Sequence, residues 1–221
     1  MTSPAVLFDV DGTLVDSNYV HVHAWARAFA DAGIAVESWR IHRSIGMDGG
    51  KLLSSLAGDA DEDATGKAKE LHSTYYQELS SLLSPLPGAL DLLDAVAQRG
   101  LQVVLATSAP EDELDVLRRV LGVDDIVSEM TSSQDVETAK PDPSIVEIAL
   151  DRAGVSVGGA VFVGDSVWDM TASTKVDLRC VGVRCGGVST DELTEAGAAE
   201  VYDNPADLLA RLESSVIGRL S

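Results

Sequence analysis

Two carboxylates lie close together at the point where an apolar run ends. Asp9 and Asp11 follow the run AVLF and are separated by Val10 alone. In a continuing strand, side chains two apart face the same side, so both carboxylates would point into one space. One could then act as a nucleophile, while the other transfers a proton to the leaving oxygen and later removes one from water. Gly12 follows at once and would let the chain turn tightly beside a substrate.

Other reactive side chains follow two later apolar runs. Thr107 and Ser108 come at the end of LQVVLAT, and Asp165 comes at the end of AVFVGD. Asp169 follows four residues after Asp165, and Lys140 lies between the two runs in TAKPDP. Ligands of open parallel sheets bind beyond the carboxyl ends of the strands, so we expect all these side chains to converge on one cleft.

Carboxylates that converge on one cleft cannot all stay charged without a cation. Mg²⁺ is the expected ion, because it accepts a few carboxylates, keeps several waters and takes oxygens from a substrate phosphate. The Thr107 hydroxyl, the backbone N–H groups near Ser108 and the Lys140 ammonium would bind that phosphate. The pattern therefore predicts a magnesium site that handles a phosphorylated substrate.

Short runs rich in Val and Leu alternate along the chain with amphipathic helical patterns. The runs are almost entirely apolar, as expected for parallel strands covered on both faces. The alternation predicts a doubly wound, Rossmann-like α/β sheet. The expected strands are residues 5–9, 101–107, 160–165 and 179–183, with a short run at 200–203. The expected helical stripes are Leu90, Leu93, Val96 and Ala97, then Leu114, Leu117, Val120 and Leu121, and a helix over residues 143–153.

One stretch, from about residue 17 to residue 83, shows helical patterns and no convincing strand. Its last helix is expected to bury Leu71, Tyr75, Leu79 and Leu82. The two prolines of SPLPG then mark a linker. We therefore expect an α/β domain made of residues 1–15 and 85–221, with an inserted helical domain of residues 16–84.

The composition excludes several classes of partner. The 221 residues carry 36 acids against 16 bases, a formal charge of −20. Such a surface repels nucleic acid and anionic lipid, so neither is an expected partner.

No window is apolar enough to span a membrane, and the N-terminus has no signal-peptide pattern. Cys180 and Cys185 lack the further ligand pairs of a zinc site, and we interpret them as small core residues of a cytoplasmic protein.

Four motifs in order resemble those of the haloacid dehalogenase-like superfamily. They are DVDGT, the ATS at a strand end, KPDP and GDSVWD. The resemblance covers most of the chain, because the helical insertion is similar to the α-helical cap of that family. Within the family, the sequence most resembles the branch of phosphoglycolate phosphatase and β-phosphoglucomutase.

The resemblance implies a role for each matched residue. Asp9 would form an aspartyl-phosphate, and Asp11 would be the general acid and base. An aspartate at position 11 also implies phosphoester chemistry, because family members that cleave carbon–halogen or carbon–phosphorus bonds lack it. The phosphoryl group would be held by Thr107, Ser108 and Lys140, and Mg²⁺ by Asp9, the Asp11 carbonyl, Asp165 and Asp169.

The helical insertion offers weaker candidates. The branch often has a histidine early in its cap, which implies that His21 contacts substrate, whereas Trp25 is expected in the core. His42 and His72 are expected at the surface. Lys51, beside the loop GMDGG, is a second candidate for substrate contact, and a solvated basic edge is the alternative interpretation.

The leading functional prediction is a Mg²⁺-dependent phosphatase that acts on a small phosphorylated metabolite. The protein is expected to be a monomer, with a dimer as the alternative. The alternative is a mutase of the β-phosphoglucomutase kind. Such mutases have an arginine just after the cap-loop glycine, whereas this chain reads MDGGK there. A third hypothesis is an inactive binding protein on the same fold, but that protein would be expected to lack at least one of the motif residues. The sequence names no particular substrate.

Overall fold

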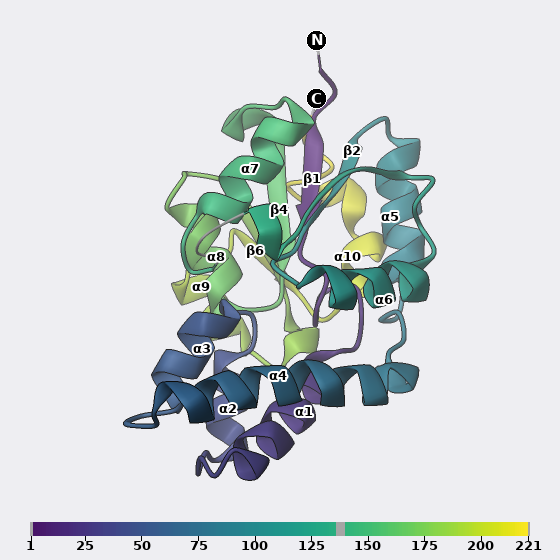
Figure 1. The fold of residues 1–221 in the computed structure, drawn as a ribbon. Coiled ribbons are helices and arrows are strands. Elements are labelled where there is room, and N and C mark those ends of the chain that lie inside the picture. The colour runs from purple at the N-terminus through teal and green to yellow at the C-terminus, as the bar shows by residue number, and fades with distance from the viewer. Residues whose placement is uncertain (1, 136–139, 221) are drawn as a thin grey trace. The chain divides into compact units, whose positions relative to one another are not determined.

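The computed structural model describes residues 2–135 and 140–220, which form two compact units (Figure 1). One unit comprises the described residues of Met1–Asp16 and Ser84–Ser221, and the other is Ser17–Leu83. The insertion expected from the sequence, residues 16–84, differs from the second unit by one residue at each end.

In the described part of the first unit, six strands form one sheet in the order β3-β2-β1-β4-β5-β6, and every neighbouring pair is parallel. The order reverses direction at β1, which lies between β2 and β4, so the carboxyl edge beside β1 is the topological switch point where ligands bind. The strands are β1 (Ala5–Phe8), β2 (Gln102–Ala106), β3 (Val127–Thr131), β4 (Ala160–Gly164), β5 (Cys180–Val183) and β6 (Glu200–Tyr202).

Helices cover both faces of this sheet, as Figure 1 shows, with α7 and α8 on one face and α5 and α10 on the other. This arrangement confirms the predicted doubly wound α/β fold. The helices of the unit are α5 (Ala89–Gln98), α6 (Glu111–Leu121), α7 (Ser144–Ala153), α8 (Val167–Thr174), α9 (Thr190–Glu195) and α10 (Pro205–Ala210).

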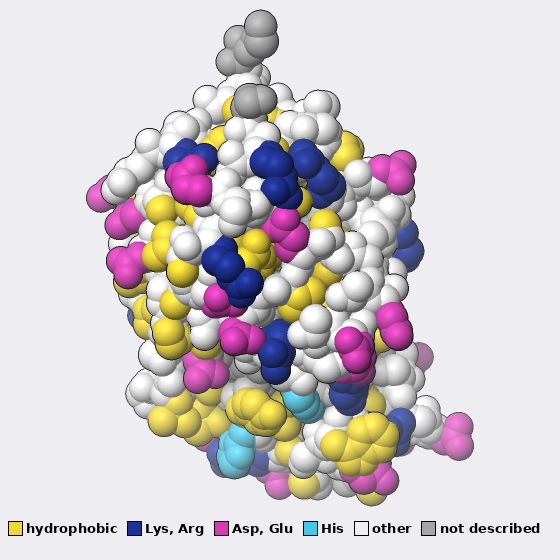
Figure 2. Space-filling model, turned by 180° about the vertical axis from the view of Figure 1, so that it is seen from behind, with side chains coloured by type: hydrophobic (Ala, Val, Ile, Leu, Met, Phe, Trp, Pro, Cys, Tyr) yellow, Lys and Arg dark blue, Asp and Glu magenta, His cyan; other side chains and the backbone are white. Residues whose placement is uncertain are grey.

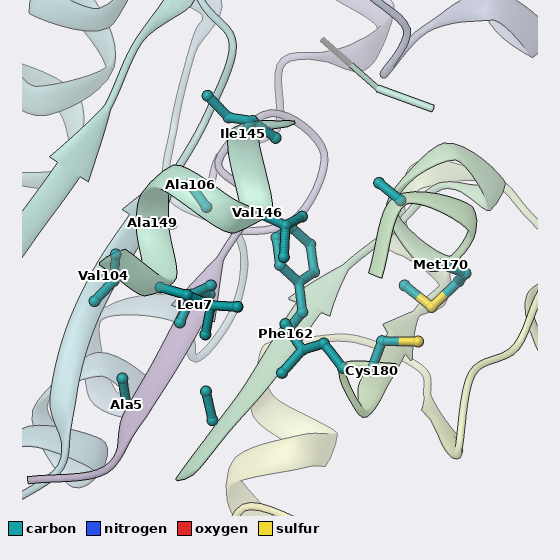
Figure 3. Close-up of a cluster of buried hydrophobic side chains, with 14 of the residues drawn as sticks. Ala5, Leu7, Val104, Ala106, Ile145, Val146, Ala149, Phe162, Met170 and Cys180 are labelled. Carbon is teal, nitrogen blue, oxygen red and sulfur yellow. The ribbon is translucent and has the colours of Figure 1, made fainter. Parts of the chain in front are cut away.

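The core on one face of the sheet joins the central strands to α7 and α8 (Figure 3). Leu7 of β1 and Phe162 of β4 are fully buried there against Val146 of α7, and Met170 of α8 belongs to the same cluster. Side chains at every second strand position share one face, so this packing fixes the register of the central strands. The strand ends, and the polar residues that follow them, are thereby held in place.

The second unit contains only helices among its regular elements, and its apolar side chains form a core of their own. Trp25 and Phe29 of α1 are buried in that core with Ile41 of α2 and Leu52 of α3. The helices are α1 (Asn18–Asp31), α2 (Ser38–Ser44), α3 (Gly49–Leu56) and α4 (Glu62–Leu79).

Four details of the sequence prediction are wrong. Strand β3 was not expected, because its segment VSEMT is an edge strand whose Ser128 and Glu129 are exposed, so it lacks an apolar run. Leu82 and Leu90 are exposed rather than parts of buried stripes. His72 is buried rather than at the surface, because it lies between the aromatic rings of α1 and Tyr76 of its own helix.

Acidic and basic side chains lie interspersed on the face shown in Figure 2. The net charge of −20 therefore does not make this face uniformly acidic. Among the described helices, none is both long enough and apolar enough to cross a bilayer.

Candidate active site

Three polar residues are the first to follow three neighbouring strands. Asp9 follows β1, Thr107 follows β2 and Asp165 follows β4. Because β1 pairs in parallel with both β2 and β4, these residues lie along the same edge of the sheet. The apolar strands end there because a carboxylate cannot continue into the dry core without a partner.

Lys140 is the cation at this edge. Its ammonium donates a hydrogen bond of 2.6 Å to Asp9 Oδ1 and lies 2.7 Å from Asp169 Oδ1. Only 1% of Lys140 is exposed, and its Nζ lies 5.6 Å from the centre of the Phe162 ring. A lysine is seldom buried without a charged partner, so the carboxylates account for its position.

Three buried carboxylates, Asp9, Asp165 and Asp169, form a cluster in which one oxygen of each lies within 4.8 Å of the others. Three carboxylates against the one ammonium of Lys140 leave two negative charges in a site with little access to water. Like charges at such separations repel strongly in a medium of low dielectric constant. The cluster therefore needs a further cation, or a proton, to be stable.

The protonation of the cluster reflects this excess of acid. Burial raises the pKa of Asp9; Lys140 opposes the shift, and Asp169 and Asp165 add to it, so the pKa stays well above its usual value. Burial lowers the pKa of Lys140, but Asp169 and Asp9 reverse the shift and hold that pKa above its usual value. Lys140 is therefore charged at neutral pH, and a further cation would favour the ionised form of Asp9.

Asp169 is held by the start of helix α8. The Ser166 hydroxyl and backbone N–H both donate to Asp169 Oδ2, at 2.6 and 3.0 Å, and Asp169 N–H donates back to Ser166 Oγ. This reciprocal pair is a capping box, which fixes both the helix start and the carboxylate. A Cβ added at Gly164 would lie 2.6 Å from Asp169 Cγ, so only glycine leaves room for this carboxylate.

Asp165 is oriented by Thr13, whose hydroxyl donates to Asp165 Oδ1 at 2.8 Å. Thr13 is fully buried in the turn that follows β1. Its role was not anticipated from the sequence, although it follows directly on the Asp-x-Asp-Gly stretch. Ser166 was also missed, although Ser-x-x-Asp ahead of an apolar run is a recognisable start of a helix.

Asp11 lies half-buried in the turn after β1, where its backbone forms an isolated bridge with Val15. Gly12 has a φ of +73°, which a glycine adopts without strain, and so the turn can be tight. The carboxylate of Asp11 is not a member of the buried cluster. The resemblance implies a metal contact for the backbone carbonyl of Asp11 alone, which leaves its side chain for proton transfer.

Thr107 and Ser108 lie at the edge of β2. Thr107 is buried; its hydroxyl accepts a hydrogen bond of 3.0 Å from the Ala109 backbone, and its carbonyl accepts one from Thr131. Ser108 is half-buried beside it. These contacts fix the loop whose hydroxyl and amide groups were predicted to bind phosphate.

The two candidates from the insertion, His21 and Lys51, belong to the helical unit Ser17–Leu83. His21 is buried, and its Nδ1 lies 3.2 Å from His72 Nε2. Lys51 is half-buried at the start of α3, where its backbone N–H donates to Asp48. Contact of either residue with substrate stays a prediction.

The donor set of the cluster fits a hard divalent cation such as Mg²⁺. All three side chains offer carboxylate oxygens, which Mg²⁺ prefers over nitrogen or sulfur. The surplus of buried negative charge supplies the electrostatic reason for a cation, and three carboxylates would leave part of its shell for water and substrate.

Comparison with known proteins agrees with this geometry. The family described as "Haloacid dehalogenase-like hydrolase" matches residues 6–183. A phosphoglycolate phosphatase of Rhodospirillum rubrum is 31% identical over 92% of this chain and 88% of its own length. A hydrolase from Pseudomonas syringae has a solved structure with a TM-score of 0.91 and 34% identity, covering 96% of this chain and 99% of that one.

A structure described as a putative β-phosphoglucomutase from Thermotoga maritima is also similar, with a TM-score of 0.71 and 26% identity over 96% of this chain and all of that one. Both solved structures share the fold of this chain over nearly its whole length. The chain belongs to the haloacid dehalogenase-like hydrolase family and is a hydrolase of phosphoric monoesters.

Proposed function

We propose that this protein is a Mg²⁺-dependent phosphatase that hydrolyses a small phosphorylated metabolite through an aspartyl-phosphate on Asp9. The observation that carries the proposal is the buried cluster of three carboxylates at the switch point of the sheet, two of which, Asp9 and Asp169, contact the Lys140 ammonium. A bound Mg²⁺ would neutralise charge on the cluster and on the phosphoryl oxygens.

In the first half of the reaction, the Asp9 carboxylate attacks phosphorus and the bond to the leaving oxygen breaks. Asp11 donates a proton to that oxygen, so the alcohol leaves neutral. Lys140 and Thr107 hold the oxygens of the phosphoryl group, and backbone N–H groups near Ser108 add further donors. Burial raises the pKa of Asp9, the Lys140 ammonium opposes that shift, and a bound Mg²⁺ would further favour the ionised carboxylate that attacks.

In the second half, Asp11 removes a proton from water, which attacks the phosphorus of the aspartyl-phosphate. The bond between Asp9 and phosphorus breaks, and inorganic phosphate leaves. Asp165 and Asp169 would hold the Mg²⁺, and hydroxyl donors from Thr13 and Ser166 respectively keep the two carboxylates in place. The helical unit Ser17–Leu83 would act as a cap that excludes bulk water, with His21 and Lys51 as its candidate contacts to substrate.

The experiment that tests this proposal is phosphate release from p-nitrophenyl phosphate, with Mg²⁺ and again with excess chelator. Release that depends on Mg²⁺ supports the proposal, and release that persists in chelator contradicts the metal requirement. The physiological substrate then needs a panel, in which 2-phosphoglycolate comes first because the relative from Rhodospirillum rubrum is named for it.

A mutase would behave differently in the same experiments. It would interconvert sugar phosphate isomers and would require a sugar bisphosphate as activator, whereas a phosphatase releases phosphate without one. The assay of β-glucose 1-phosphate, with and without the bisphosphate, therefore separates the two functions.

We also expect the protein to work in the cytoplasm as a monomer. Size-exclusion chromatography with light scattering would measure its oligomeric state.

A further inference from the structure

A turn that follows β5 contacts one carboxylate of the cluster directly. Residues Arg184–Gly186 form this single 3-10 turn, and its last residue is buried. A Cβ added at Gly186 would lie 1.7 Å from Asp165 Oδ2 and 2.6 Å from Asp165 Cγ. The backbone of the turn is therefore packed against the Asp165 carboxylate.

This contact, and not the backbone conformation, is what requires glycine at position 186. The next residue, Gly187, has a φ of +86°, a value that favours glycine, but Gly186 is not among the glycines with positive φ. An alanine could adopt the backbone of Gly186 without strain, but its methyl group would overlap Asp165. Either the turn or the carboxylate would then have to move.

Cys185 fastens the same turn to the loop that follows β1. Its Sγ lies 3.1 Å from the carbonyl oxygen of Gly12, to which the thiol donates a hydrogen bond. The residue after Gly12 is Thr13, whose hydroxyl donates to Asp165 Oδ1. The thiol thus joins the segment on one side of the carboxylate to the segment on the other.

Together these contacts form a closed ring around Asp165. Thr13 holds one oxygen, the Gly186 backbone packs against the other, and the hydrogen bond from Cys185 to Gly12 closes the ring. We propose that Cys185 and Gly186 are positioning residues for Asp165, and that they set the affinity of the carboxylate cluster for a divalent cation. The inference rests on the proposed function, because it takes Asp165 as a metal ligand.

Changes to the groups that orient a metal ligand typically weaken metal binding by about 10- to 100-fold. We expect Gly186→Ala to have an effect of about that size, because the methyl group displaces Asp165. Cys185→Ala opens the ring without an overlap and should weaken binding by about 5-fold, the equivalent of one modest hydrogen bond. Cys185→Ser keeps a donor and should restore affinity to within about twofold of the wild type.

The test is a titration of the purified, metal-free full chain with Mn²⁺, in which the electron paramagnetic resonance signal reports free Mn²⁺. This readout does not depend on phosphatase activity. Gly158→Ala is the matched glycine control, since a Cβ there meets nothing within 4 Å. Cys180→Ala is the matched thiol control, since Cys180 Sγ donates to Gly197 O instead. Circular dichroism of each metal-free variant checks that it is folded.

Weaker Mn²⁺ binding by Gly186→Ala and Cys185→Ala, with recovery in Cys185→Ser and unchanged controls, supports the inference. Wild-type affinity in both folded variants overturns it and leaves the proposed function standing. If the wild type itself binds no Mn²⁺, the metal requirement of the proposed function fails, and this inference fails with it. Should Gly186→Ala not fold, the comparison of Cys185→Ala with Cys185→Ser decides the matter alone.

Discussion

Lys140 donates a hydrogen bond of 2.6 Å to Asp9 Oδ1, and both side chains are almost completely buried. The two residues are 131 positions apart in the sequence, so this contact ties the loop before α7 to the end of β1. The same ammonium also contacts Asp169 at the start of α8. One cation therefore links three separate segments of the chain at the proposed catalytic site.

Removal of that cation is expected to cost stability as well as activity. In Lys140→Met, the buried carboxylates of Asp9 and Asp169 lose their partner, and breaking a buried ion pair in this way costs about 3–5 kcal/mol. Urea unfolding in excess chelator measures the loss. Lys175→Met is the matched control, because Lys175 is exposed and donates to the Pro141 carbonyl, so its loss should cost less than about 1 kcal/mol. Equal losses in the two variants would contradict the role assigned to the buried pair.

Mg²⁺ is expected to stabilise the folded protein through the carboxylate cluster. At a concentration of about 100 times the dissociation constant, a bound ligand adds about 2.7 kcal/mol to the free energy of unfolding. For a protein of this size, that gain corresponds to a rise in Tm of roughly 5–10 °C. Asp165→Asn should lose most of the rise, whereas Asp151→Asn, an exposed change on α7, should keep it. Thermal unfolding with and without Mg²⁺ checks this, and an undiminished rise in Asp165→Asn would exclude Asp165 as a ligand.

The helical unit is expected to lose stability as the pH falls, because of His72. Burial, and then the neighbouring His21, lowers the pKa of His72 from 6.5 to about 2. Below about pH 6.5, His72 binds a proton in the unfolded chain but not in the folded chain. The free energy of unfolding therefore decreases as the pH falls from about 6.5 toward 2. The loss is about 1.4 kcal/mol per pH unit, or about 2 kcal/mol between pH 7 and pH 5.

The variant His72→Phe isolates this effect, since phenylalanine keeps a ring beside Trp25 but carries no titratable group. Urea unfolding at pH 7 and pH 5 should show that the wild type loses about 2 kcal/mol more than His72→Phe does. His23→Phe, a change at an exposed histidine of α1, should keep the wild-type pH dependence. The same dependence in the wild type and in His72→Phe would show that His72 is not the responsible group.

The sequence was most informative where a strand is buried on both faces. The runs that became β1, β2, β4 and β5 are nearly all apolar, and so they and the polar residues at their ends could be located without a structure. Edge strand β3 could not, because Ser128 and Glu129 face solvent and give the segment no apolar run. The burial of His72 was equally hidden, because only the packing of α1 on α4 brings its ring beside Trp25.

The residues that orient the carboxylates were harder to predict than the carboxylates themselves. Motif spacing points to Asp165, but the role of Gly186 depends on how closely a turn 21 positions later approaches it. Such contacts join segments far apart in the sequence, and the type of each residue is ordinary when considered alone. A glycine whose backbone needs no positive φ carries no local signal at all.

The central claim is that Asp9 is the nucleophile, and the rate of phosphate release by Asp9→Asn tests it most directly. The measurement compares this variant with the wild type on p-nitrophenyl phosphate in saturating Mg²⁺, with circular dichroism to show that both are folded. We expect a loss of at least about 10⁴-fold, because an amide cannot form the phosphorylated intermediate. A folded Asp9→Asn that keeps more than about one-tenth of the wild-type rate would contradict nucleophilic catalysis by Asp9.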